Sequence, residues 1–587
     1  MTRSREVARG PLLGLRLADL GFGEYVHDQP SGRFPVYTRG NVGEVWPFVM
    51  YPLSASLARE APYDPFSAAF VALGALTAEE AGPANGSPMF SAVFSGYAYL
   101  NLTATRLVAI RSIGSSIETS DRTYVGAEAG VPHADHPDDR SIRRSAALAV
   151  SGLSMMRSKD TPMVHRDKLR VAGWRRALTP VAECSDDQLV ERIHSGVGFM
   201  TDVFQTHVDV SGKAGGAAGL LTDFCAKQLH DESVALTLLT GIGDVESAEP
   251  ARALWNLAQL VRNDPELTAA FDAGPDGLRG RLVGTPFAAS LSEFQNEFGS
   301  RGPNEWDICS PSWGTDARMP LALVDRLRAA GPEQSPGARA DVARQRREDA
   351  LADANSQLNV VTRWLLQDLL RVATMYSQAR ERQKTTVVKI VHEMRLALNE
   401  LARRIVGHAG EPDDINFVYW HELAAYRANP GNFAPDIAAR RATRAELEQR
   451  VPPMIFDGQI SSPTTWPLRD SGSDQRFPAS SGATLTGTSG NAGTVTGLAR
   501  VVEDPFDDVE LGPGTILIAP HTDPSWTPLF LGVDAVVVSV GGQMSHAVIV
   551  ARELGIPCVL NISDATKVIP NGARITVNGA DGTVTVH

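Results

Sequence analysis

A long stretch without glycine or proline does most to limit the folds open to this chain. It runs from Ala338 to Val406. Glycine and proline are the residues that most strongly interrupt helices, so the whole stretch is expected to be helical. It is much longer than an average globular helix, which favours two consecutive helices. Helical periodicity also dominates from about Pro62 onward, and we therefore expect a mostly α-helical body.

A second pattern begins near Leu485, where short β-type runs replace the helical periodicity. Asp581 and Gly582 between the last two runs favour a hairpin turn. This pattern predicts a compact α/β domain that ends the chain. The runs are Val495, Ala499–Val502, Thr515–Ala519, Ala535–Val540, Cys558–Leu560, Ile575–Val577 and Thr583–Val586.

One histidine in this domain has a setting that suits phosphoryl chemistry. The run Ala535–Val540 leads into Gly541-Gly542-Gln543-Met544-Ser545-His546, and a helical pattern follows. Ser545 is expected to be the N-cap and Gly555 to end the helix, so His546 falls in its first turn. Free backbone N–H groups and the helix dipole favour a bound phosphate there. The same field keeps the imidazole neutral and nucleophilic near pH 7.

The run from Gly541 to Pro557 closely resembles the phosphohistidine signature of the PEP-utilising enzymes. That family includes PEP synthase, pyruvate phosphate dikinase, rifampin phosphotransferase and the split phenylphosphate synthases. The upstream segment Pro520–Phe530 also resembles the swivelling domain of this family. The resemblance implies that His546 carries a phosphoryl group. It also implies a phosphate loop formed by Gly541, Gly542 and Ser545.

A charged helical segment is the next candidate. Arg380 and Lys384 are four residues apart and share one helix face, to which Glu381 is adjacent. Two cations on one face could neutralise a transferring phosphoryl group. A solvated helix face is the alternative that the spacing alone would favour. This Arg-Glu-x-x-Lys pattern is similar to the family, in which such an Arg and Lys face the phosphohistidine. The resemblance gives Arg380 and Lys384 as catalytic candidates and Glu381 as a substrate-binding candidate.

The segment Phe298–Asp307 contains an Arg-Gly-Pro-x-Glu pattern that also resembles the family. It gives Arg301 and Glu305 as substrate-binding candidates. A structural Arg–Glu pair that holds the turn is the alternative. The family often has His before this Arg, whereas this chain has Ser300, so no proton-transfer role is assigned at that position.

A segment near the start, Thr38–Pro47, resembles the opening of the substrate domain in rifampin phosphotransferase-like proteins. Its Asn-Val-Gly-Glu-Val pattern gives Asn41 and Glu44 as further substrate-binding candidates. Another polar segment, His133–Asp139, has a composition typical of metal ligands. It lies among prolines, however, and we expect a solvated turn there and no metal site.

The expected fold class is a mostly α acceptor-binding domain followed by a small C-terminal α/β swivelling phosphohistidine domain. Residues 452–484 are rich in Ser, Thr, Pro and Gly and are expected to form a flexible linker. A flexible chain of that length spans about 30 Å, enough to let the last domain swing. The expected parts are an N-terminal tail (1–32), a helical substrate-binding domain (33–451), the linker (452–484) and the phosphohistidine domain (485–587).

Composition excludes several classes of function. The net charge is −13 and no basic block occurs, which argues against a nucleic-acid partner. The four cysteines are far apart, so zinc or redox motifs are not indicated, and the count suits a reducing cytosol. No apolar run reaches membrane-spanning length and no signal-peptide pattern opens the chain. We expect a cytoplasmic protein with no membrane partner.

The resemblance implies an enzyme that works as part of a relay. Only 41 residues follow His546, too few for the barrel that completes PEP synthase. No Walker-type loop is found, and no ATP-grasp region is recognised. The family therefore implies a separate ATP-grasp subunit that binds ATP and Mg²⁺ and phosphorylates His546. This chain would transfer the phosphoryl group to the hydroxyl of a small hydrophobic acceptor, either phenol-like or an alcohol. A phosphorylation-coupled dehydratase or lyase, or a non-catalytic binding protein that kept the fold, are the alternatives.

Overall fold

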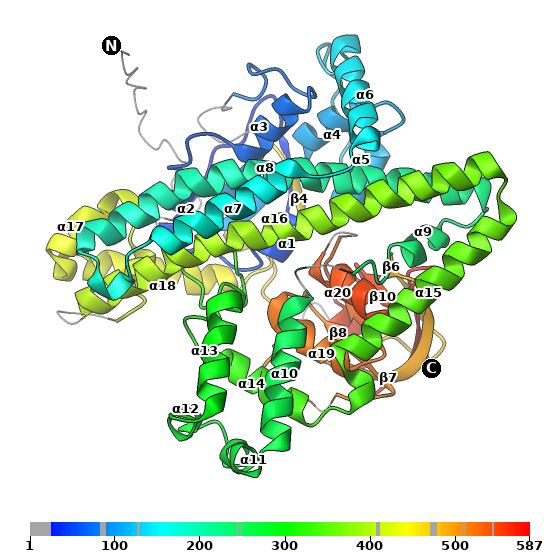
Figure 1. Ribbon diagram of the computed structural model, residues 1–587. Helices are drawn as coiled ribbons and strands as arrows, with labels where there is room; N and C mark the ends of the chain where they lie inside the picture. Colours follow the sequence, from blue (N-terminus) through cyan, green and yellow to red (C-terminus); the bar gives the residue numbers. More distant parts are fainter. Residues whose placement is uncertain are drawn as a thin grey trace.

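The computed structural model shows a large helical body and a C-terminal α/β domain (Figure 1). It describes residues 25–82, 90–125, 130–243, 246, 248–406, 411–469, 478–507, 509, 511–542 and 545–587. Most of the expected tail and two signature residues, Gln543 and Met544, lie outside the described residues. Within these ranges no helix combines the length and the apolar character needed to cross a membrane.

Within the described ranges, α-helices make up most of the body, and three more belong to the C-terminal domain. In the body they are α1 (Val42–Val45), α2 (Pro52–Ala58), α3 (Pro65–Ala72), α4 (Leu102–Arg111), α5 (Ile117–Val125), α6 (Ile142–Arg157), α7 (Pro162–Ala177), α8 (Asp186–Gln228), α9 (Ser233–Leu238), α10 (Glu249–Asn263), α11 (Pro265–Asp272), α12 (Leu278–Arg281), α13 (Pro286–Phe298), α14 (Arg318–Arg328), α15 (Pro336–Gln357), α16 (Val360–Val406), α17 (Leu423–Ala428) and α18 (Ala434–Glu448). In the C-terminal domain they are α19 (Thr527–Gly532), α20 (His546–Leu554) and α21 (Ala565–Val568).

Two sheets are present in the described residues. The body has a four-stranded sheet in the order β2-β3-β1-β4, and the C-terminal domain has an eight-stranded sheet in the order β5-β12-β11-β7-β8-β9-β10-β6. The strands are β1 (Val36–Thr38), β2 (Ser91–Phe94), β3 (Tyr97–Asn101), β4 (Ile455–Asp457), β5 (Thr484–Thr486), β6 (Thr488–Asn491), β7 (Thr494–Val501), β8 (Thr515–Ala519), β9 (Ala535–Val538), β10 (Cys558–Leu560), β11 (Arg574–Asn578) and β12 (Thr583–Val586).

The two longest helices, α8 and α16, pack side by side and form the spine of the body (Figure 1). The prediction of two consecutive helices across Ala338–Val406 is confirmed, because α15 ends at Gln357 and α16 begins at Val360. Asn359 explains the restart: its side-chain oxygen accepts hydrogen bonds from the backbone N–H groups of Val361 and Thr362. That contact satisfies two of the free donors at the start of α16.

The segment 452–484 differs from the flexible linker expected from its composition. Strand β4 pairs antiparallel with β1 and so completes the small sheet of the body. Trp466 is buried and its ring lies 6.0 Å from that of Tyr97. The early part of the segment, up to at least Trp466, is therefore packed structure. Its composition could not reveal this, because its pairing partner lies near the other end of the chain.

The predicted α/β domain is observed. Strands β7, β8, β9 and β10 are parallel neighbours at the centre of the sheet, and antiparallel strands flank them. Strands β11 and β12 form the expected hairpin around Asp581 and Gly582. The predicted bounds of β8, β10 and β12 agree with the structure.

The C-terminal domain is docked on the body. Figure 1 shows it, in orange and red, beside α10 and α15. Trp526, Phe530 and Val548 of the domain share one hydrophobic core with Leu254 and Trp313 of the body. Burying large apolar side chains between the two parts stabilises this arrangement. It also brings the first turn of α20 to the middle of α16, where the site is assembled.

Candidate active site

His546 is the first residue of α20, as predicted. Ser545 precedes it with an extended backbone (φ −71°, ψ 163°), and Gly555 ends the helix in the left-handed region (φ 65°). The Ser545 hydroxyl does not cap the helix, and its Oγ is buried without a hydrogen-bond partner among the described residues. A buried polar atom without a partner is rare. This one belongs to the predicted phosphate loop, where an arriving anion could accept its hydrogen.

Two threonine hydroxyls hold the His546 ring. Nε2 lies 3.1 Å from Oγ1 of Thr527, and Nδ1 lies 3.3 Å from Oγ1 of Thr522. The ring also meets Phe530 edge to face, with centroids 6.2 Å apart. A hydroxyl can donate or accept, so this pair orients the ring and is compatible with either tautomer.

The electrostatic setting keeps His546 neutral. Burial, together with the positive charges of Lys384 and Arg301, lowers the pKa of His546 well below its ordinary value of 6.5. The sequence predicted a neutral ring from the helix dipole, and the structure adds desolvation and two cations of the body as causes. A neutral ring keeps the lone pair that a nucleophile needs.

A carboxylate fixes the two cations that face His546. Lys384 Nζ lies 3.0 Å from Glu305, and Nη1 of Arg301 donates to both Glu305 oxygens at 3.2 Å. Arg301 also donates 2.7 Å to the hydroxyl of Thr385. Burial would raise the pKa of Glu305, but Lys384 and Arg301 outweigh it and lower that pKa. The ionised Glu305 therefore positions both cations.

Arg380 and Lys384 share one region of the site, as the spacing predicted. Arg380 Nη1 lies 2.5 Å from Oε1 of Glu381, which is itself buried. The side chains of Arg380 and Lys384 keep 16% and 15% of their surface exposed, so a ligand can still reach them. Both cations act on a third group, because both lower the pKa of Glu44.

Glu44 joins the body to the predicted phosphate loop. The backbone N–H of Gly542 donates 2.6 Å to its Oε1. Burial raises the pKa of Glu44 to about 7 against the opposing effects of that hydrogen bond, Arg380 and Lys384. Asn41, the other candidate of this segment, does not join Glu44 in the site. It is exposed at the start of α1 with φ 67°, and no contact of its side chain with the site occurs among the described residues.

The structure adds residues that the sequence did not single out. Asp523 follows Thr522, and burial raises the pKa of its carboxyl to about 7, with Glu305 adding to the effect. Arg395 is fully buried and donates to the backbone oxygens of Glu305 (3.0 Å) and Asp307 (2.7 Å). Asp523 lay inside a segment recognised only for its overall resemblance. Arg395 had no local signal, because its role depends on a turn about ninety residues away.

Four rings of the body pack around Trp306 and form what is called here the aromatic cluster: Trp46, Phe204, His207 and Trp306. The ring of Trp306 lies 6.4 Å from that of Trp46, 5.4 Å from Phe204 and 5.7 Å from His207. All four side chains are half-buried, so part of their surface is open to a ligand. Flat apolar ligands favour such walls.

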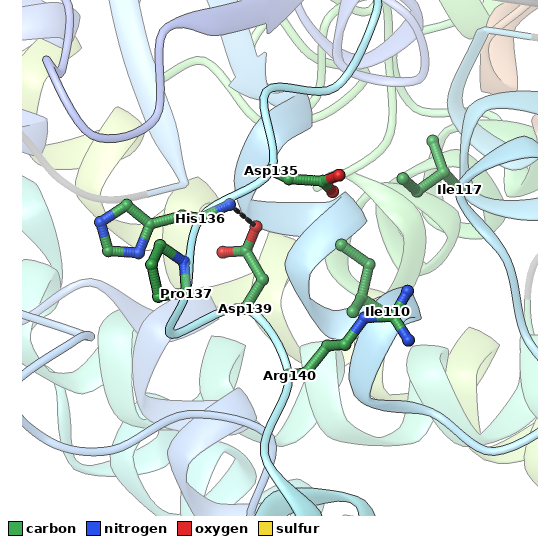
Figure 2. A pocket seen from close by; sticks show the side chains of 7 residues that line it. All are labelled: Ile110, Ile117, Asp135, His136, Pro137, Asp139 and Arg140. Carbon is green, nitrogen blue, oxygen red and sulfur yellow. Dashed lines mark hydrogen bonds between the residues drawn. The ribbon is translucent and has the colours of Figure 1, made fainter.

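The metal-like loop lies elsewhere, beside a pocket of about 430 Å³ that Figure 2 shows. His133, Asp135 and Asp139 offer ligand atoms within 4.8 Å of one another. Arg33 already pairs with Asp139 at 2.6 Å, and His133 Nε2 lies 3.0 Å from the same carboxylate. The expected turn is exposed except at His133 and Asp139, which anchor it.

Comparisons with known proteins agree with the predicted resemblance. Residues 207–381 match the family model "Rifampicin phosphotransferase fourth domain", and residues 511–582 match "PEP-utilising enzyme, mobile domain". The first match includes His207, Arg301 and Glu305, and the second includes His546. The resemblance to the PEP-utilising family is therefore confirmed, and it covers both sides of the site.

The curated relatives are longer than this chain. It is 29% identical over 414 residues to the rifampicin phosphotransferase of Streptomyces sp, covering 65% of this chain and 46% of that protein. It is 26% identical over 377 residues to the Bacillus subtilis (strain 168) enzyme of that name, covering 61% and 42%. The prodigiosin synthesizing transferase PigC of Serratia marcescens is 25% identical over 461 residues, covering 76% and 49%. The chain thus spans about half the length of these relatives.

Proposed function

We propose that this relative of the rifampicin phosphotransferases carries a phosphoryl group on His546 and transfers it to a hydroxyl of a small hydrophobic acceptor. One observation carries the proposal. The neutral His546 ring, held by two threonines, is docked against Lys384 and Arg301 of the helical body. A nucleophilic nitrogen and fixed cations are the two elements that phosphoryl transfer requires.

The cations support the transfer step. A phosphoryl group in transit spreads negative charge over three equatorial oxygens, and preorganised positive groups stabilise that charge. Lys384 and Arg301 are fixed by Glu305, so little reorganisation is needed when the phosphoryl group arrives. Arg380 adds a third positive charge beside them. We propose that Arg380 and Lys384 act at the acceptor step, because both belong to α16 of the body.

The phosphate loop supports the carrier role. The N–H of Gly542 now binds Glu44, and the Ser545 hydroxyl has no partner among the described residues. A phosphoryl group on His546 could accept both hydrogens, with Glu44 displaced. Such backbone and hydroxyl donors at a helix N-terminus are typical phosphate ligands.

We propose that ATP and Mg²⁺ act at a separate ATP-grasp subunit that charges His546, by resemblance to the split phenylphosphate synthases. The carboxylates at this site suit Mg²⁺ poorly, because each faces a cation or a backbone donor. Glu305 binds Lys384 and Arg301, Glu381 binds Arg380, and Glu44 accepts from Gly542. Mg²⁺ is usually held by carboxylates together with nucleotide phosphates, which places it with ATP.

The carrier role can be tested without the donor subunit. The full chain is treated with phosphoramidate, a small nitrogen-linked phosphoryl donor, and then digested and analysed by mass spectrometry. We expect an acid-labile, base-stable phosphate on the peptide that contains His546. His521 is the nearest rival, and a His521→Asn variant should still be labelled. Label that persists in His546→Asn would contradict the proposal.

A further inference from the structure

His207 is a half-buried histidine near the cations, and the proposed transfer does not yet use it. It lies on α8, and its ring stacks on Phe204 with centroids 5.5 Å apart and lies 5.7 Å from the ring of Trp306. Its Nδ1 is buried and has no hydrogen-bond partner among the described residues. A buried nitrogen without a partner is unfavourable, so a group that supplies the missing contact gains affinity.

The remaining contact of the ring defines its tautomer. His207 is hydrogen-bonded to the backbone of Arg380, and this contact raises its pKa. A contact that favours the protonated ring is one in which the ring donates to a carbonyl. Because Nδ1 has no partner, the donor is Nε2, and Nδ1 keeps a lone pair. Burial, Arg380 and Lys384 together lower the pKa of His207 well below 6.5, so the ring is neutral.

The position of His207 fits the attacking side of the reaction. In an in-line transfer the acceptor oxygen approaches the phosphorus opposite the leaving nitrogen. The leaving nitrogen belongs to His546 in the C-terminal domain, so a base for the acceptor belongs on the body. The positive charge of Lys384 lowers the pKa of both His207 and His546. Asp523 is less suited, because it lies in the same domain as His546. Its carboxylate also already accepts a hydrogen bond from the backbone N–H of Ser525.

The carboxylates of the body are less suited, because each lies against a cation or a backbone donor. Glu305 holds Lys384 and Arg301, and Glu44 accepts the N–H of Gly542. Glu381 pairs with Arg380 through Oε1, and its Oε2 is buried without a hydrogen-bond partner among the described residues. His207 is the group in the described part of the site that combines a neutral lone pair with aromatic walls. These walls, Phe204 and Trp306, suit a flat ring on the acceptor.

We infer that His207 is a catalytic base, whose Nδ1 takes the proton from a phenolic hydroxyl of the acceptor during transfer from His546. The inference rests on the proposed function. The acceptor oxygen forms its bond to phosphorus as the bond from phosphorus to the His546 nitrogen breaks. The electron pair of that bond returns to the His546 ring. The hydroxyl proton moves to His207, which becomes an imidazolium and later releases the proton to water.

The ionisation state of the acceptor gives a test that a merely structural role would not pass. The full chain is charged with phosphoramidate, freed of donor, and mixed with phenol or with 4-nitrophenol at a pH where the nitrophenol is already ionised. Loss of label from His546 is then followed by rapid quench. General-base catalysis contributes about 10²-fold or more, so His207→Gln should slow transfer to phenol by about a hundredfold. Transfer to nitrophenolate should stay close to that of the unmodified chain, since no proton has to be removed.

Two further variants guard the result against misfolding. His207→Ala should lose the same activity toward phenol and regain part of it when free imidazole is added. His194 lies on the same helix, is exposed, and faces Trp420 away from the cations, so His194→Gln should transfer to both acceptors normally. Charging of His546 should be unchanged in every variant.

The outcomes separate this inference from the proposed function. Equal slowing with both acceptors, or no slowing with either, would overturn the role of His207 while leaving His546 as carrier. Charging followed by discharge to neither phenol would also overturn it, because the aromatic cluster would then not admit the inferred acceptor. Failure of the unmodified chain to charge at His546 would instead remove the proposed function, and this inference with it.

Discussion

The two sides of the site are built in different ways. The residues around the His546 ring, Thr522, Thr527 and the loop from Gly541, come from one short stretch of one α/β domain. The facing residues of the body come from four segments that are far apart in sequence: α1, α8, the turn 301–306 and α16. One side is a local motif, and the other exists only after the body has folded.

The charges are divided in the same way. The cations that lower the pKa of His546, Lys384 and Arg301, both belong to the body. The C-terminal domain supplies hydroxyls, backbone N–H groups and the histidine. Under the proposed function, charging of His546 is therefore expected to depend on the C-terminal domain. Discharge is expected to depend on contact between the two parts.

The largest effect is expected from the residue that both half-reactions need. His546→Asn keeps the size and polarity of the position but removes the nucleophilic ring nitrogens, so neither charging nor discharge should be detectable. The measurement is incorporation of labelled phosphate, followed by overall product formation. His521→Asn serves as the control, because His521 contacts Phe48 and its ring makes no described contact with His546. Turnover by the His546 variant would show that the carrier lies elsewhere.

The division should appear most clearly in the cation variants. Lys384→Ala and Arg380→Ala should charge normally, because the C-terminal domain is intact. Discharge should fall by about a hundredfold, since one preorganised contact to a developing charge contributes about 3 kcal/mol. Lys384→Arg should restore little, because a planar fork replaces a compact charge between Glu305 and His546.

A neighbouring lysine provides the matched control for that experiment. Lys389 lies on the same helix but pairs with Glu297 at 2.7 Å, outside the site. Lys389→Ala should discharge at the normal rate. If Lys384→Ala and Arg380→Ala also discharged normally, the pair would be a solvated helix face, and the division between the two sides would lose its electrostatic basis.

The contrast between the two sides also explains how much could be predicted. The helix start at His546, its end at Gly555 and the surrounding strands follow from local chemistry, and the structure agrees with them. The four-residue spacing of Arg380 and Lys384 predicts a shared helix face, and the resemblance to the family gives that face its predicted role. On the body side, only patterns with a family resemblance were found.

The parts that were missed depend on distant contacts. His207 and the other rings of the aromatic cluster meet only through tertiary packing, and each was an ordinary aromatic in the sequence. The early part of the segment 452–484 looked like a linker, because composition reports polarity and not the strand partner that β4 finds in β1. Asn41 was proposed as a substrate-binding residue from a motif, yet its side chain makes no contact with the site among the described residues.

A smaller effect is expected from the threonines that hold the ring. Thr527→Val and Thr522→Val each remove one hydroxyl while nearly preserving shape. A single hydrogen bond contributes about 1 kcal/mol, so each variant should slow charging by about fivefold. Because the ring is the shared element, discharge should slow by a similar factor, unlike in the cation variants. The measurement is the rate of labelling by phosphoramidate and the rate of label loss. A loss confined to discharge would show that the hydroxyls serve the body side.

The smallest effect, and the one that probes the contact between the two parts directly, is expected at Glu44. Its folded pKa of about 7 lies above its ordinary value of 4.5. The folded state therefore binds this proton more tightly than the unfolded state does. The resulting contribution to stability is present below about pH 4.5 and is lost as the pH rises through about 7. Asp523 and Glu553, whose pKa values are also raised to about 7, act in the same direction.

Glu44→Gln keeps an oxygen that can accept the N–H of Gly542 but cannot ionise. Its melting temperature should therefore fall less steeply than that of the unmodified chain between about pH 5 and about pH 8. Glu44 is partly exposed, so the difference at the alkaline end should be about 1 kcal/mol, or about 2 °C. Some slope should remain, because Asp523 and Glu553 still titrate. Thermal unfolding of the full chain across this range measures the effect. Parallel curves for the two proteins would mean that the Glu44 carboxyl is not buried between the body and the phosphate loop in solution.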